Sequence, residues 1–143
     1  MSPVDIQLIY RKIKLIEADL TLLTKYNNIS FEKYAKNQEL QLVVERLLEK
    51  ITGRLIDLNY HLLKEKYEVM PEDYYDSFIE IGKRKIITAE FAEEIAKSAG
   101  LRNALAHEYD KIDEKMVHKA IGTSLTQIPK YLKTISDTLH TVY

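Results

Sequence analysis

The 143-residue sequence contains no cysteine, only four glycines and only three prolines. Without cysteine the chain can form neither a disulfide framework nor a thiolate metal site. The scarcity of glycine and proline, together with a hydrophobic content of 45%, is typical of packed helices. No alternating apolar run of strand length competes with that interpretation. We therefore predict an all-α fold.

The sequence also lacks a signal peptide and any apolar run of about 18 residues, so we expect neither secretion nor insertion into a membrane, and a cytoplasmic location. Its length suits a single domain over residues 1–143, since no break in composition divides the chain. The formal net charge of −1 argues against a general polybasic coat for nucleic acid. RNA binding depends on local patches rather than on the total charge, so it stays possible.

Motifs for metals and cofactors are missing as well. The four histidines show neither H-x3-H nor H-E-x-x-H spacing: they are His61, His107, His118 and His140. No glycine-rich loop is present that could cradle phosphates, so a nucleotide or metabolite binder has no motif in its favour. We expect no metal site and no cofactor.

Apolar residues recur at helical spacing through most of the chain and predict an antiparallel bundle of four to five helices. The first helix begins with Ser2 as N-cap and Pro3 in its first turn. Its apolar stripe, spaced alternately by three and four residues, ends near Tyr26. A short helix over 31–36 and a long helix over 38–66 follow.

Three further helices are expected, over residues 71–81, from 88 into the segment 102–109, and from 113 to the C-terminus. Gly82 is expected to end the first of them. Gly100 is expected to allow a kink or a tight backbone contact in the second. Pro129 is expected to bend the last helix or to divide it in two.

The segment from Arg102 to Tyr109 reads RNALAHEY and is poor material for a core, because its polar ends would need partners. Its side chains suit RNA cleavage without a metal. Arginine presents a planar fork of donors to phosphate oxygens. Histidine can act as base or acid near neutral pH. The alternative is a surface pair of Arg102 and His107 that arose by chance.

Helical geometry restricts how the two side chains cooperate. Five residues at about 100° each place Arg102 and His107 about 140° apart around a straight helix. Either the helix ends near His107, so that the turn swings the imidazole round, or a second copy of the chain completes the site.

The spacing Arg102, four residues, His107, one residue and Tyr109 resembles the R-x4-H-x-Y motif of the HepT toxins, a branch of the HEPN ribonucleases. The order of predicted helices is also similar to that family. The resemblance implies a toxin of a toxin–antitoxin pair whose partner is a minimal nucleotidyltransferase of the MntA type. Arg102 and His107 would be catalytic, Asn103 would support the active site, and the antitoxin would adenylylate Tyr109.

Two lysine-rich segments are candidates for RNA binding, although each is also an ordinary solvated surface: Lys83, Arg84 and Lys85, then Lys111 and Lys115 in a four-residue repeat that continues to Lys119. Asp57 and Asn59 on the long helix can border the cleft or face solvent.

One histidine per chain is a shortfall, because cleavage needs both a base and an acid. A two-fold homodimer with facing motifs would supply a second His107 and a second Arg102. We then expect products with a 2′,3′-cyclic phosphate and a 5′-hydroxyl. The rival hypothesis is a non-catalytic helical module that recruits a nucleotidyltransferase, which would have no need of an intact Arg102–His107 pair.

Overall fold

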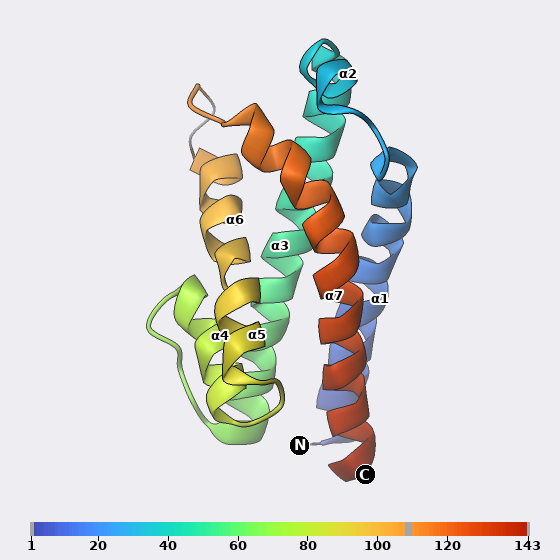
Figure 1. Ribbon diagram of the computed structural model, residues 1–143. Coiled ribbons are helices and arrows are strands. Elements are labelled where there is room, and N and C mark those ends of the chain that lie inside the picture. The colour runs from blue at the N-terminus through green and yellow to red at the C-terminus, as the bar shows by residue number, and fades with distance from the viewer. Residues whose placement is uncertain (1, 108–109, 143) are drawn as a thin grey trace.

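The computed structural model describes residues 2–107 and 110–142, and the described residues form helices without any strand (Figure 1). The elements, in chain order, are α1 (Pro3–Leu23), the 3-10 turn η1 (Thr24–Tyr26), α2 (Phe31–Ala35), α3 (Gln38–Tyr67), α4 (Tyr74–Lys83), α5 (Ala89–Ile95), α6 (Lys97–His107) and α7 (Glu114–Val142). The all-α bundle is confirmed. The described residues form more helices than the four to five expected for the bundle. The short α2 counts as a separate helix, and the helix predicted from residue 88 onward is divided into α5 and α6.

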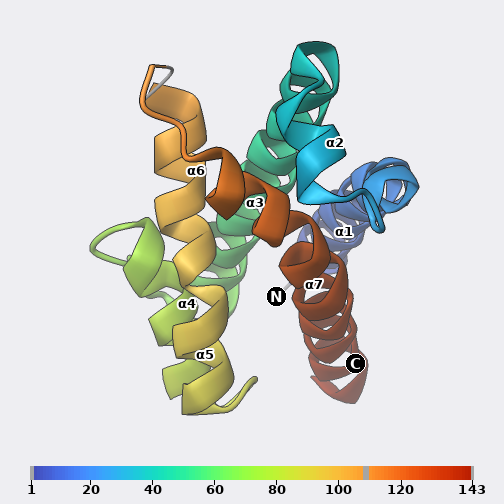
Figure 2. The ribbon, with the colours of Figure 1, turned by 45° about the horizontal axis from the view of Figure 1, so that its top comes forward.

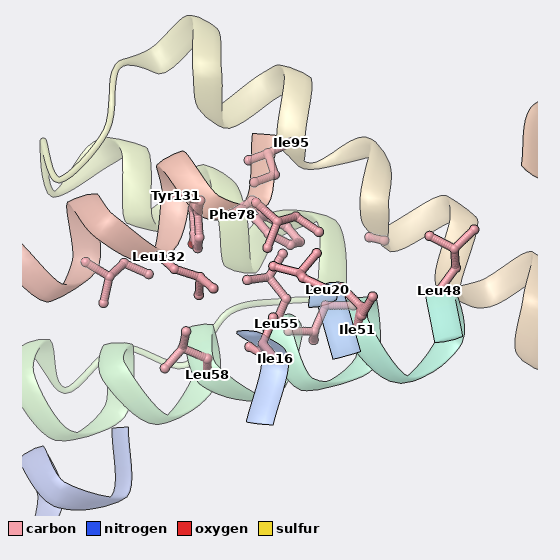
Figure 3. Close-up of a cluster of buried hydrophobic side chains, with 14 of the residues drawn as sticks. Ile16, Leu20, Leu48, Ile51, Leu55, Leu58, Phe78, Ile95, Tyr131 and Leu132 are labelled. Carbon is pink, nitrogen blue, oxygen red and sulfur yellow. The ribbon is translucent and has the colours of Figure 1, made fainter. Parts of the chain in front are cut away.

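Helix α3 forms the centre of the bundle and contacts α1, α2, α4, α6 and α7. α1 and α7 lie on one side of it, and α4, α5 and α6 lie on the other (Figures 1 and 2). Figure 3 shows how side chains from five helices meet between these two sides; they include Ile16, Leu20, Leu55, Phe78, Ile95, Tyr131 and Leu132. One hydrophobic core therefore holds both sides against α3.

A buried charge fixes how α1 runs along α3. The Asp19 side chain is only 6% exposed; it accepts a hydrogen bond from Arg54 at 2.5 Å, and Lys50 lies at 3.4 Å. A carboxylate this deeply buried needs such partners, because an unpaired charge would be strongly penalised. The ion pairs therefore select the antiparallel register in which these residues face each other.

The helix starts follow the sequence closely. Ser2 forms a capping box with Asp5, and the Ser30 and Thr88 hydroxyls accept from backbone N–H groups in the first turns of α2 and α5. Asp113 likewise accepts from the N–H groups of Lys115 and Met116 at the start of α7. These predictions are confirmed, because a cap depends only on residues a few positions apart.

Two predicted features of α4 differ. α4 begins at Tyr74 rather than at Pro71, because Asp73 accepts from the Asp76 N–H at 2.7 Å and acts as the N-cap. Gly82 does not end α4, which runs on to Lys83, and the left-handed residue after it is Lys85 at φ 62°. A Cβ on Gly82 would lie 2.7 Å from the Ala92 Cβ. The absence of a side chain at Gly82 therefore allows α4 and α5 to pack closely.

The helix expected to run from Thr88 into the motif breaks at Ala96 and not at Gly100. A Cβ on Gly100 would meet nothing within 4 Å, so the expected tight contact is wrong. The Ala99 N–H instead bonds to the Ala96 carbonyl at 3.0 Å, a tightened turn that separates α5 from α6.

Pro129 lies inside α7 and does not divide it. The helix changes direction along its length, with its first part near α6 and its last part beside α1 (Figure 2). Proline removes one N–H and clashes with the carbonyl four residues earlier, which favours such a bend. Within the described residues, no helix has the length and apolar character needed to cross a membrane.

Candidate active site

Arg102 lies on the face of α6 that packs against α3 and α4, and its side chain is half-buried. Its guanidinium carbon lies 5.1 Å from the centre of the Tyr74 ring, at the first turn of α4. A cation over an aromatic face is attracted by the ring quadrupole, which limits the orientations that the guanidinium samples. The arginine of the motif is therefore held in place by an aromatic side chain from another helix.

Tyr74 in turn contacts Tyr60 of α3, with the ring centres 6.1 Å apart and the planes 85° from parallel. Such an edge-to-face pair is a favourable aromatic arrangement. Burial raises the pKa of Tyr60, and so do the neighbouring Tyr74, Asp73 and Asp76. The Tyr60 phenol therefore stays neutral, and the carboxylates of Asp73 and Asp76 lie near enough to affect it.

A shallow groove of about 320 Å³ follows these side chains across three helices. Its lining consists of Gly53, Ile56, Asp57, Tyr60, Tyr74 and Arg102. Asp57 forms an ion pair with Lys12 of α1, and its side chain is still 62% exposed. The groove thus carries a cation at one position and an exposed carboxylate at another.

A buried hydrogen-bond network supports the groove from below. The Tyr131 hydroxyl donates to Asn59, the Asn59 amide donates to Ser77 at 3.1 Å, and the Ser77 hydroxyl donates to the Tyr74 carbonyl at 2.7 Å. Asn59, Ser77 and Tyr131 are all fully buried. Asn59 therefore neither faces solvent nor borders the groove, whereas Asp57 does border it.

His107 is exposed and is the last residue of α6. The helix is continuous from Arg102 to His107, so their directions differ by about 140° and their positions by about 7.5 Å along the axis. α6 is described as far as His107, and over this length it does not aim the imidazole at Arg102. Asn103 is exposed on the same helix, and the predicted modification residue Tyr109 lies outside the described residues.

The two lysine-rich segments lie at different ends of the molecule. Residues 110–115 follow α6, so Lys111 and Lys115 are exposed at the end where His107 lies (Figure 1). The segment 83–85 joins α4 to α5 at the opposite end. The structure therefore does not bring Lys83, Arg84 and Lys85 to the motif.

At that far end the positive charge is partly compensated. Lys83 and Arg84 each form an ion pair with Glu80 at 3.2 Å. Lys83, Lys85 and Lys130 of α7 line a hollow of about 660 Å³. Sequence spacing gives no signal for Lys130, which reaches this hollow only through the packing of α7.

Among residues 2–107 and 110–142, no three side chains of His, Asp or Glu lie close enough together to hold a metal ion. The polar and aromatic side chains that the structure does bring together, at the groove, are Arg102, Tyr60, Tyr74 and Asp57.

The sequence model of the family described as Ribonuclease HepT-like matches residues 16–135, which include Arg102, His107 and every residue lining the groove. This chain belongs to the HepT-like ribonuclease family. The resemblance read from the R-x4-H-x-Y spacing is thereby confirmed. The tRNA nuclease HepT of Aphanizomenon flos-aquae is similar over 142 residues at 41% identity, covering 99% of this chain and 97% of the relative.

Solved structures share the fold. The tri-AMPylated HEPN toxin of Shewanella oneidensis, in complex with MNT antitoxin, superposes with a TM-score of 0.81 at 20% identity, covering 96% of this chain and 99% of that one. The cytosolic protein YutE from Bacillus subtilis superposes with a TM-score of 0.84 at 19% identity, covering 99% and 94%. The helical arrangement around α3 is therefore the HEPN arrangement.

Proposed function

We propose that this chain is an endoribonuclease toxin that cleaves RNA without a metal ion, with Arg102 and His107 as its catalytic residues. The observation that carries the proposal is the placement of Arg102, whose guanidinium is fixed over Tyr74 at the edge of an open groove, on the helix that ends at the exposed His107. Membership of a ribonuclease family supports a catalytic role in RNA cleavage for these two side chains.

In this proposal the guanidinium of Arg102 binds the oxygens of the phosphate under attack, where negative charge accumulates. One imidazole takes the proton of the 2′-hydroxyl, whose oxygen attacks the phosphorus, while the bond to the 5′-oxygen breaks and that oxygen receives a proton from an acid. The products are a 2′,3′-cyclic phosphate and a 5′-hydroxyl. DNA resists, because it lacks the attacking 2′-hydroxyl.

A homodimer completes the site in this proposal. Because an α-helix directs residues five apart about 140° away from each other, we infer that one chain does not offer both Arg102 and His107 to a single phosphate. Two chains related by a two-fold axis, with the His107 ends facing each other, would present two arginines and two histidines to one cleft. One imidazole would then serve as the base and the other as the acid.

The regulation we propose is adenylylation of Tyr109 by a nucleotidyltransferase of the MntA type. The HEPN toxin of Shewanella oneidensis, which has the same fold, is described as tri-AMPylated and in complex with MNT antitoxin. An AMP group attached near Arg102 and His107 would add bulk and negative charge where RNA phosphate must bind, and so would block cleavage. The relative from Aphanizomenon flos-aquae is described as a tRNA nuclease.

The experiment is cleavage of total RNA by purified protein in EDTA, with Arg102→Ala, Arg102→Lys and His107→Ala beside the wild type. We expect cleavage by the wild type alone, and a loss of about a hundredfold or more in Arg102→Lys, since lysine keeps the charge but loses the planar fork. Cleavage at equal rates by all four proteins, or by none, would favour the non-catalytic module that recruits a nucleotidyltransferase. Cleavage of a DNA copy of a good substrate would contradict the mechanism.

A further inference from the structure

The groove beside Arg102 contains aromatic and acidic side chains that a phosphate site does not need. A site for phosphate alone requires positive charge, yet this groove is lined by two tyrosine rings and the exposed carboxylate of Asp57. The carboxylates of Asp73 and Asp76 also act on the Tyr60 phenol. This acidic and aromatic part of the groove would repel a second phosphate. It suits a flat ring that carries hydrogen-bond donors.

We propose that the groove is a binding site for one RNA base next to the phosphate held by Arg102, and that it selects a base with an exocyclic amino group. This inference rests on the proposed ribonuclease function and deepens it. Tyr60 and Tyr74 supply the stacking surface, Asp57 accepts a hydrogen bond from the amino group, and Arg102 holds the adjoining phosphate.

The shape of the groove supports a single base. Its volume of about 320 Å³ is at the lower end of the ~300–1,000 Å³ found for ligand pockets, which is enough for one ring system. The tyrosine planes stand 85° apart, so a base that lies flat on one ring would direct its own edge toward the face of the other. Gly53 borders open space, because a Cβ there would meet nothing within 4 Å.

The charges support selection by hydrogen bonding. Lys12 holds one oxygen of Asp57, Oδ2, in an ion pair, and the side chain is still 62% exposed. The ion pair leaves the second oxygen able to accept from a donor in the groove, whose lining includes Asp57. Guanine, adenine and cytosine each carry an amino group, whereas uracil does not. A carboxylate that accepts from a base amino group is a known form of base readout.

The groove is also held rigid, as a selective site requires. The Ser77 hydroxyl bonds to the Tyr74 carbonyl and is itself tied to Asn59 and Tyr131 in the core. Tyr74 therefore sits on a fixed first turn of α4, and the base and the phosphate would be positioned relative to each other by the same tyrosine.

Direct binding is measured with a short oligoribonucleotide that contains 2-aminopurine, a fluorescent base with an amino group, and whose 2′-hydroxyls are methylated so that it cannot be cleaved. Stacking on an aromatic ring quenches its fluorescence. We expect quenching by the full-length wild type and by His107→Ala, and binding about tenfold weaker in Tyr74→Leu and Tyr60→Leu. Unchanged quenching in both tyrosine variants would overturn the proposal.

Tyr75→Leu is the matched control. Tyr75 is the next residue along α4 and is 47% exposed, but it lines a different hollow beside α5 with Glu90, Glu93 and Lys97. We expect this variant to quench like the wild type. Equal losses in Tyr75→Leu and Tyr74→Leu would show that the groove is not the site.

Selectivity is measured with cleavable oligoribonucleotides that differ in one base beside the scissile phosphate. We expect the wild type to cleave with guanine, adenine or cytosine at this position about tenfold faster than with uracil, and Asp57→Asn to lose that preference. Lys12→Gln removes the ion pair but keeps the carboxylate, and should keep the preference. Loss of preference in Lys12→Gln, or wild-type cleavage without any base preference, would overturn the proposal.

The two proposals fail in different ways. If the wild type cleaves no RNA, the ribonuclease proposal is wrong whatever the groove binds. If the wild type cleaves RNA and Tyr74→Leu lowers the rate equally for all four bases, Tyr74 only positions Arg102 and the base site is wrong. A rate loss confined to substrates with an amino base supports both.

Discussion

At the residue scale, two fully buried tyrosines differ in what their hydroxyl groups meet. The Tyr131 hydroxyl donates to Asn59, whereas the Tyr34 hydroxyl has no hydrogen-bond partner among the described residues. Burial raises the pKa of both phenols far above the ordinary value, so both hydroxyls stay protonated at neutral pH. The two side chains therefore form a matched pair for testing what a buried hydrogen bond contributes.

We expect Tyr131→Phe to lower the free energy of unfolding by about 1–3 kcal/mol, because the Asn59 carbonyl oxygen would be left unpaired in the core. Tyr34→Phe should leave that free energy unchanged or raise it, since a buried hydroxyl without a partner is destabilising. Urea unfolding followed by circular dichroism measures both. Each variant keeps its aromatic ring, so equal losses in the two would contradict this account of the network.

At the scale of elements, the contact between α4 and α5 depends on Gly82. A Cβ at this position would lie 2.7 Å from the Ala92 Cβ, which belongs to a buried residue of α5 and has no rotamer with which to move away. Gly122 in α7 is also helical, but a Cβ there would meet nothing within 4 Å. The same substitution should therefore have opposite effects at the two positions.

We expect Gly82→Ala to destabilise the fold by about 1–3 kcal/mol through overpacking. Gly122→Ala should stabilise it by about 0.5–1 kcal/mol, because alanine loses less backbone entropy than glycine in a helix interior. Thermal unfolding of the two variants beside the wild type measures the difference. A stabilising Gly82→Ala would show that α4 and α5 can separate without cost.

At the scale of the whole molecule, the question is whether one chain or two make the active site. Arg102 packs toward α3 and α4 while His107 is exposed on α6, and the proposed mechanism takes its base from the His107 of one chain and its acid from the His107 of the other. A dimer that contains one His107→Ala chain would then lack either the base or the acid.

We expect an equal mixture of wild-type and His107→Ala proteins, unfolded together and refolded, to keep about a quarter of the activity of the same total amount of wild type, since only a quarter of randomly formed dimers carry both histidines. The control is the same two proteins refolded separately and then mixed, which should keep about half of that activity. A co-refolded mixture that also keeps half of the activity would show that each chain's site works with its own His107 alone.

Much of the fold was predictable from local patterns. Ser2, Ser30, Thr88 and Asp113 begin helices where the sequence places them, because a cap is a hydrogen bond between residues three or fewer positions apart. The break at Ala96 was not predictable. The apolar spacing runs on through it, and the turn is set by how α5 and α6 pack against α3 and α4.

The sequence by itself determined the all-α class, most helix boundaries and the family, since helical periodicity, capping and the spacing of Arg102, His107 and Tyr109 are all local properties. Only the tertiary structure decided that Tyr74 lies under Arg102, that Asn59 is buried while Asp57 lines the groove, and that the 83–85 segment is at the far end from His107. The physical reason is that these relations depend on which faces of different helices meet. That outcome is set by packing across the whole core, and no short stretch of sequence records it.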